Sequence, residues 1–158
     1  YDLLLHVYND AAELNFACGR FDLSLRRCLE IHRNAKCLQD KLAASYIRVE
    51  VFYCQRKINV AIKSCMVVLE SIGEPLPERP NTFQILSEWR KTKKMMKDFD
   101  SDALSSLPPM EDPVKRFSQR YLSLLVNMLF CAMNNELAAI AILRMVQNTL
   151  CYGSCDFA

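Results

Sequence analysis

The chain has 158 residues, 51% of them hydrophobic and 24% charged, an ordinary composition for one folded domain with a sizeable core. Its net charge of +2 provides no long-range field toward nucleic acid or an anionic membrane, so neither is expected as a partner. With only 3 Gly and 6 Pro, turns are few, which favours long helices over a many-stranded sheet.

Two helices are expected at the start of the chain. The first runs from Asp2 to Cys18 and stops at Gly19, and the second covers residues 21–33. The short Gly-Arg connection makes them antiparallel neighbours. Helical spacing assigns their core faces to Leu4, Val7, Tyr8, Ala11, Leu14 and Cys18 in the first helix, and to Leu25, Cys28, Leu29 and His32 in the second.

The stretch Leu38–Pro80 repeats this pattern as two helices followed by a proline stop. Phe21–Leu25 matches Ile58–Ile62 at a shift of about 37 residues, close to the period of about 34 for tetratricopeptide repeats. We therefore expect two tetratricopeptide-like helix pairs over residues 1–73. Small residues recur where the helices must approach closely, at Ala17, Ser24, Cys54 and Ala61.

A proline-rich linker is expected over residues 74–80, because proline removes a backbone donor and restricts the preceding residue. Asn81 or Thr82 can cap the next helix, which is expected to reach Asp98. Its basic outer arc fits either a solvated face, the favoured interpretation, or a calmodulin-type or membrane-surface helix. The inner arc is expected to be Ile85, Trp89, Met95 and Met96, and the outer arc Arg90, Lys93, Lys94 and Lys97.

Further helical hairpins of the same array are expected over residues 81–158, with a second proline-rich break at 107–113. Ser101 is expected to cap a short turn, and Asp112 with Pro113 begins a helix that reaches about Met133. The following helix, 137–150, is apolar nearly all round and is therefore expected to be buried between neighbours. The predicted fold is all-α, about seven helices stacked as a tetratricopeptide-like right-handed α-solenoid.

Catalytic and metal-binding motifs are missing from the sequence. There is no P-loop and no GxGxxG, and the two histidines, His6 and His32, fall on different helices without a CxxC motif. Cys28 and His32 share a helix face, but no oxyanion element accompanies them. We therefore assign no catalytic, cofactor-binding or metal-binding residue, and expect a chain that is not itself an enzyme.

The eight cysteines are scattered, mostly at positions that helical spacing assigns to the core. Buried thiols act as small hydrophobic residues, and their number is too low for a disulfide scaffold. This usage indicates a reducing compartment, so a cytoplasmic location is expected. The cysteines are Cys18, Cys28, Cys37, Cys54, Cys65, Cys131, Cys151 and Cys155.

Several short segments follow one another in an order and spacing typical of one family. They are Ala11-Ala12-Glu13, Asn34-Ala35-Lys36 with Asp40-Lys41, Ala61-Ile62, Val68-Leu69-Glu70 to Gly73, Leu76-Pro77-x-x-Pro80, Leu107-Pro108-x-Met110-x-Asp112-Pro113, and Arg144-Met145-Val146 ahead of Tyr152-Gly153. With these segments the chain resembles the helical repeat region of large signalling kinases of the predicted-ATPase (AAA/STAND) type. Serine/threonine-kinase-like, ATPase, GAF and histidine-kinase domains surround that region in the family.

The resemblance implies a non-catalytic arm, with ATP bound only in neighbouring domains of a longer chain. The start at Tyr1 without Met, and an end that resembles the beginning of another element, agree with the expectation of a fragment. None of the family's catalytic residues has a counterpart in these 158 residues.

The function expected from these observations is a helical-repeat interaction or relay module. It would bind a protein partner, or another domain of its own chain, in a groove lined by the first helix of each pair. The alternatives are a passive structural spacer and a stand-alone helical-repeat adaptor. The candidate groove residues are Asn15, Arg48, Phe52 and Tyr53.

Overall fold

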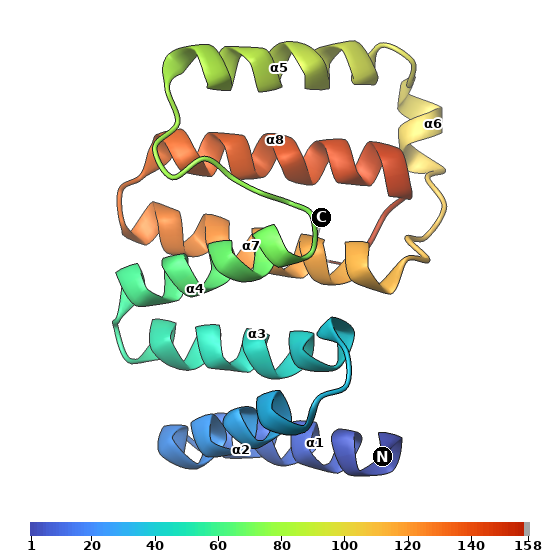
Figure 1. Ribbon diagram of the computed structural model, residues 1–158. Coiled ribbons are helices and arrows are strands. Elements are labelled where there is room, and N and C mark those ends of the chain that lie inside the picture. Colours follow the sequence, from blue (N-terminus) through green and yellow to red (C-terminus); the bar gives the residue numbers. More distant parts are fainter. Residues whose placement is uncertain (157–158) are drawn as a thin grey trace. The chain divides into compact units, whose positions relative to one another are not determined.

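The computed structural model describes residues 1–156, except for the side chains of Ser101 and Ser105. This part of the chain contains eight helices and no strand, so the all-α class is confirmed. The helices are α1 (Asp2–Ala17), α2 (Phe21–Asn34), α3 (Leu38–Cys54), α4 (Ile58–Ser71), α5 (Thr82–Met96), α6 (Ser101–Ser105), α7 (Pro113–Cys131) and α8 (Asn135–Tyr152), shown in Figure 1.

The expected number of about seven helices is one too low. Asp100 starts the short helix α6 by accepting a hydrogen bond from the Ala103 backbone N–H at 2.8 Å. The expected cap, Ser101, lies outside the described side chains, and Phe157 and Ala158, in the expected further element, lie outside the described residues. The other expected caps are confirmed: Asn81 accepts from Gln84, and Asp112 accepts from Val114.

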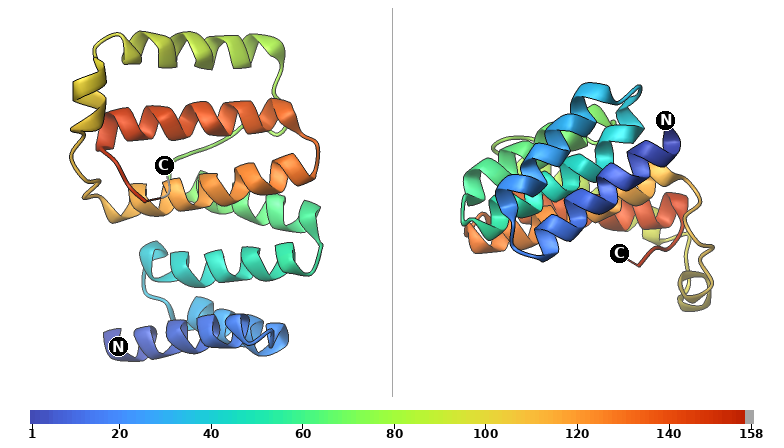
Figure 2. Two further views of the ribbon diagram at one scale, coloured as in Figure 1. Left: turned by 180° about the vertical axis from the view of Figure 1, so that it is seen from behind. Right: turned by 90° about the horizontal axis from the view of Figure 1, so that it is seen from below.

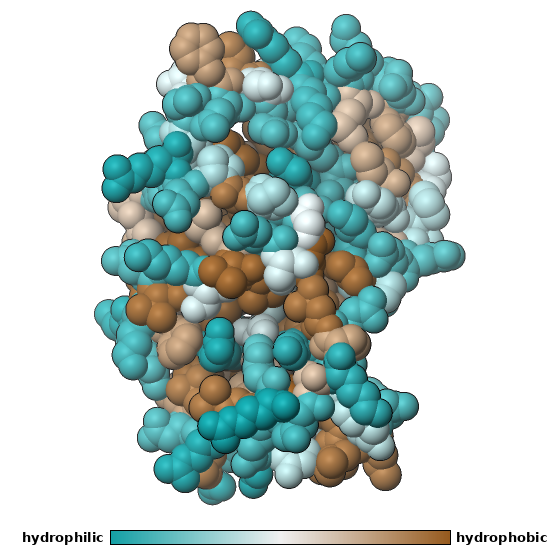
Figure 3. Space-filling view, in the orientation of Figure 1, coloured by the Kyte–Doolittle hydropathy of each residue, from teal (hydrophilic) through white to brown (hydrophobic). Residues whose placement is uncertain are grey.

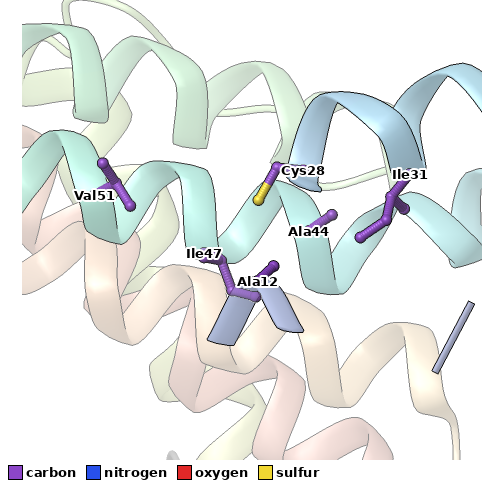
Figure 4. Close-up of a cluster of buried hydrophobic side chains, with 6 residues drawn as sticks. All are labelled: Ala12, Cys28, Ile31, Ala44, Ile47 and Val51. Carbon is purple, nitrogen blue, oxygen red and sulfur yellow. The ribbon is translucent and has the colours of Figure 1, made fainter. Parts of the chain in front are cut away.

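The chain forms two compact units, the first ending at Val68 and the second beginning at Leu69. In the first unit, α1, α2 and α3 each contact the other two (Figures 1 and 2). Ala12 and Ala44 are fully buried, and their small size allows the helices to approach closely. Figure 4 shows a cluster of buried side chains in the core of this unit: Ala12, Cys28, Ile31, Ala44, Ile47 and Val51.

The packed face of α1 differs from the expected one. Leu5, Tyr8 and Phe16 pack on the core beside Ala12, whereas Leu4, Val7 and Leu14 are exposed. Helix α1 carries apolar residues on two sides, and periodicity alone cannot decide which side turns inward. The side with the small residue Ala12 is buried, and the hydroxyl of Ser24 there donates to the Ala12 carbonyl oxygen at 2.9 Å.

Three helix hairpins share the same three-residue turn. Its middle residue is left-handed each time: Gly19 has φ 72°, Arg56 has φ 60° and Met133 has φ 57°. In each turn the first, second and third N–H groups donate to carbonyls four, three and five residues back, respectively. The first two turns lie 37 residues apart, as do the flanking helix ends, so the repeat shift seen in the sequence is confirmed at these positions.

In the second unit, α8 contacts both α7 and α5 and therefore lies between them (Figure 1). The expected burial of this helix is confirmed. Stacking in chain order would place α7 beside α5, but α8 occupies that place, so the solenoid arrangement is not confirmed. The α7–α8 core includes Tyr121, Leu122, Leu125, Met128, Leu129, Leu137, Ile140 and Ala141.

The inner face of α5 also differs from the expected arc. Thr92 is buried and Glu88 is half-buried, while Trp89 and Met96 are exposed. Hydrophobic periodicity overlooks Glu88 and Thr92 because they are polar, although partners on α8 satisfy them, as described below. The basic outer arc is exposed, as expected.

A short backbone bridge joins the second proline-rich break to the end of α8. The Met110 N–H donates to the Ser154 carbonyl, and the Ser154 N–H donates to the Pro108 carbonyl, both at 2.8 Å. Gly153 makes this approach possible because its φ of 101° and ψ of 179° belong to a region open only to glycine. A Cβ atom at this position would lie 2.2 Å from the Pro108 carbonyl oxygen.

Replacing Gly153 with Ala should therefore lower the free energy of unfolding by about 2 to 4 kcal/mol, from backbone strain and the collision with Pro108. Urea unfolding followed by circular dichroism measures the change. Gly19→Ala is the matched control, since Gly19 also has positive φ but open space around its missing Cβ. The Gly19→Ala variant should lose only about 1 kcal/mol in free energy of unfolding. Equal losses in the two variants would contradict a tight bridge at Ser154.

Candidate functional site

The four predicted groove residues all lie in the first unit, on α1 and α3. Asn15 uses its side-chain amide within its own helix, donating to the Ala11 carbonyl oxygen at 2.6 Å. Arg48, Phe52 and Tyr53 are half-buried. The carbonyls of Asn15 and Phe52 occupy equivalent positions and accept the hydrogen bonds that close the two repeat turns. Their role in binding a partner stays a prediction.

Arg48 belongs to a polar cluster between α2 and α3. Lys41, Ser45 and Arg48 follow one another at i, i+4 and i+7, so they share one side of α3. The Ser45 hydroxyl pairs with Nε2 of His32 on α2 at 3.0 Å. Burial lowers the pKa of His32, and the positive charges of Arg48 and Lys41 lower it further, which favours a neutral imidazole.

Cys28 lies in the same region, but its chemistry is that of a core residue. Burial raises the pKa of its thiol to about 11, so the nucleophilic thiolate is scarce at neutral pH. The ring nitrogen Nε2 of His32 pairs with Ser45. The sequence placed Cys28 and His32 on one helix face, and the structure gives that face a packing role.

The expectation of a mostly buried cysteine set is wrong. Only Cys28 and Cys65 are buried among the eight, Cys155 is half-buried, and the other five are exposed. Cys18 shows the cause: it belongs to the apolar side of α1 that the structure leaves open. The two buried cysteines lie 37 residues apart, at equivalent positions of α2 and α4.

The second unit contains a buried ion pair that hydrophobic periodicity does not reveal. Glu74, in the proline-rich linker, is only 3% exposed. Its Oε1 atom accepts from Lys115 of α7 at 2.7 Å and from Asn148 of α8 at 3.2 Å, and its Oε2 atom lies 3.6 Å from Arg144. Burial favours the neutral amine of Lys115, but the hydrogen bond and charge of Glu74 prevail and raise its pKa.

The same network continues to α5. Arg144 contacts Glu88 at 3.4 Å, and the Gln147 amide donates to Glu88 at 2.8 Å and to Thr92 at 2.9 Å. Two carboxylates thus face two cations, which leaves the network electrically neutral. Every carboxylate in it is already hydrogen-bonded, so the arrangement ties the linker, α5, α7 and α8 together and presents no free acid or base.

Residues 1–156 contain no group of three or more His, Cys, Asp or Glu side chains arranged to hold a metal ion. Within the same residues, no helix combines the length and the apolar character needed to cross a membrane.

Several exposed apolar side chains of the first unit gather on α1. We call the residues Leu3, Leu4, Val7, Ala11, Leu14 and Cys18 the α1 stripe. Leu3, Leu4, Val7 and Leu14 are 79%, 59%, 53% and 66% exposed. Figure 3 shows apolar residues at the surface around the N-terminal end of α1. Such a contiguous row is typical of an interaction site, unlike single exposed apolar residues.

A cavity of about 400 Å³ lies at one end of the stripe and shares Leu4 with it. Tyr1, Tyr8 and Ile31 line it together with polar residues from the end of α2. The Tyr1 hydroxyl donates to Asp40, and the Lys36 ammonium lies 4.0 Å from the Tyr1 ring centre. The cavity is therefore walled by side chains that are held in place.

The second unit has a cavity of about 500 Å³ whose lining contains no charged side chain. Its wall comes from α5, α7, α8 and the segments that flank them. Its polar side chains are uncharged hydroxyl, amide and thiol groups. It is lined by Met96, Leu104, Leu107, Ser123, Val126, Asn127, Ile142, Met145, Val146, Thr149, Leu150, Ser154 and Cys155.

Comparisons with protein-family models, with curated proteins and with solved structures found no match for this chain. The resemblance to the helical region of predicted-ATPase signalling kinases therefore stays a prediction.

His32 should make stability depend on pH. Because its pKa is lowered by folding, the unfolded chain binds a proton more readily, so the free energy of unfolding should fall as the pH drops from about 6.5 through the folded pKa. Thermal unfolding at pH 7.5 and 5.5 measures this loss, which His32→Gln should reduce. The hydrogen bond from Tyr1 lowers the pKa of Asp40 to about 2, far below this window. The control His6→Gln, on the exposed side of α1, should keep the wild-type loss.

Removing the charge of Glu74 should be strongly destabilising. In Glu74→Gln, Lys115 and Arg144 lose a buried counter-charge, and we expect a loss of about 3 kcal/mol, near the low end for such pairs because both cations are partly solvated. Urea unfolding measures it. Glu78→Gln, at an exposed position of the same linker, should change stability by less than about 0.5 kcal/mol. A similar small change for Glu74→Gln would show that the ion pair contributes little.

Proposed function

We propose that this chain is a non-catalytic helical interaction module that relays contacts within a larger, ATPase-containing signalling protein of the cytoplasm. The observation that carries the interaction role is the α1 stripe. Four large apolar side chains in a row remain more than half exposed on a helix whose opposite side is packed. Burying one exposed Leu or Val side chain contributes about 1.5 to 3 kcal/mol, so a partner that covers the row gains substantial free energy.

The ATPase and kinase context depends on the family resemblance of the sequence. In that family the helical region joins nucleotide-binding and kinase domains, and a helical scaffold with an open apolar side suits such a connecting role. ATP would be bound by those other domains, and the partner would be a protein or another domain of the same chain. The predicted groove of Asn15, Arg48, Phe52 and Tyr53 belongs to this proposal as a second contact area.

A passive structural spacer is the second candidate. It is favoured by Asn15, whose side chain is already used within α1, and by the network around Glu74, in which both carboxylates are paired internally. A spacer that stacks on a neighbouring helix would also cover an apolar row on α1. The two candidates differ in whether the α1 stripe binds a specific partner.

A photo-crosslinking amino acid at Leu14 tests the interaction role in cells that produce the protein. We expect one recurrent protein crosslink from Leu14. Val67 is the control site, because it is 65% exposed on α4 of the same unit but lies outside the stripe. Crosslinks that are equally scarce from both sites would favour the spacer. The same crosslink from Val67 would show that the stripe is not the contact surface.

A further inference from the structure

We propose that the α1 stripe binds the apolar face of an amphipathic helix whose flanking positions are basic. This inference depends on the proposed interaction role and specifies the chemistry of the partner. It follows from the length of the stripe, the charge of its edge and the cavity at its end.

The stripe has the dimensions of a helix-binding surface. It extends from Leu3 to Cys18 along one side of α1, at spacings of three and four residues. At a rise of about 1.5 Å per residue this gives a row of about 22 Å, or four helical turns. A partner helix of about 16 residues that presents apolar side chains at the same spacing can cover it.

The outer edge of the stripe is acidic. Asp10 lies three residues after Val7 and four before Leu14, so it adjoins the row directly, and Glu13 follows one turn later. Neither carboxylate has an ion-pair partner among residues 1–156. Helix α1 contains no Lys or Arg, so nothing within the helix neutralises this edge. Basic side chains on the partner would supply the missing counter-charges.

Two cations that lie close to aromatic residues at the start of the chain are already engaged. Arg27 pairs with Glu30 at 2.8 Å and also lies 5.6 Å from the Tyr8 ring centre. Lys36 lies over the Tyr1 ring at the end cavity. The acidic edge around Asp10 therefore keeps its negative character.

The end cavity provides an anchor point. Leu4 belongs both to the stripe and to the cavity of about 400 Å³, so a helix lying along the row reaches the cavity with one terminal side chain. The Tyr1 and Tyr8 rings in its wall suit a large apolar side chain such as Trp or Leu. An anchor of this kind fixes the register of the partner helix.

The α1 stripe of a second copy is a poorer occupant. Pairing two α1 helices through their stripes would bring the Asp10 and Glu13 edges of both copies close together. Like charges at such an edge oppose association. A basic helix removes this repulsion and gains attraction from the same residues.

The test uses two synthetic peptides of about 18 residues with the same leucine row and a terminal Trp. Their flanking positions are all Lys in one peptide and all Glu in the other. Fluorescence anisotropy with the purified chain should show about tenfold tighter binding of the Lys peptide, with an advantage that shrinks as salt rises. A chain with the double substitution Asp10→Lys and Glu13→Lys should instead prefer the Glu peptide.

Val7→Glu tests the location, and Val67→Glu is its matched control. Both valines are more than half exposed, so both variants should keep the wild-type melting temperature. Binding of the Lys peptide should weaken about tenfold in Val7→Glu and stay unchanged in Val67→Glu. Equal effects of the two substitutions would overturn the assignment to the stripe.

The remaining outcomes separate this inference from the proposed function. Equal, stripe-dependent binding of both peptides would overturn the basic partner but keep the interaction role. Binding of neither peptide would overturn both. Sedimentation velocity provides the last distinction: a dimer of the wild-type chain that Val7→Glu dissociates would show that a second copy occupies the stripe.

Discussion

The buried carboxylate of Glu74 is the constraint on which the second unit depends. A charge that is removed from water must find its counter-charges nearby, or it opposes folding. Glu74 therefore requires Lys115 of α7 and Arg144 of α8 to come together at the linker. Since Arg144 also contacts Glu88, the same requirement extends to α5 and accounts for the position of α8 between its two neighbours.

The first unit is held together differently, because its helices pack through small apolar residues and carry few buried charges. Ala12 and Ala44 allow α1, α2 and α3 to meet, and once they meet, only one side of α1 is covered. The other side keeps its apolar row exposed. A surplus of apolar surface on one helix, beside unpaired carboxylates, is a physical reason for association with another helix, whereas the neutral network of the second unit has no such surplus.

Local sequence signals predicted the elements well and their faces poorly. Asn81 and Asp112 cap helices, and glycines end helices, at the positions predicted from the sequence. A cap or a left-handed turn depends only on residues within about one helical turn. The repeat shift of 37 residues also located the shared turns. The inward side of α1 was missed because both sides are apolar. The inward side of α5 was missed because its polar residues Glu88 and Thr92 accept hydrogen bonds from Gln147, which is more than fifty residues away in the chain.

The sequence by itself determined the all-α class, the positions of most helix ends and the absence of familiar catalytic motifs, since these depend on composition and on contacts between near neighbours. Only the tertiary structure decided which apolar row of α1 stays open, which cysteines are buried and where Glu74 finds its counter-charges. Those outcomes depend on pairs of residues distant in the chain, and hydrophobic periodicity contains no information about such pairs. The candidate interaction surface exists for the same reason, because α1 is apolar on two sides and only one of them packs against α2 and α3.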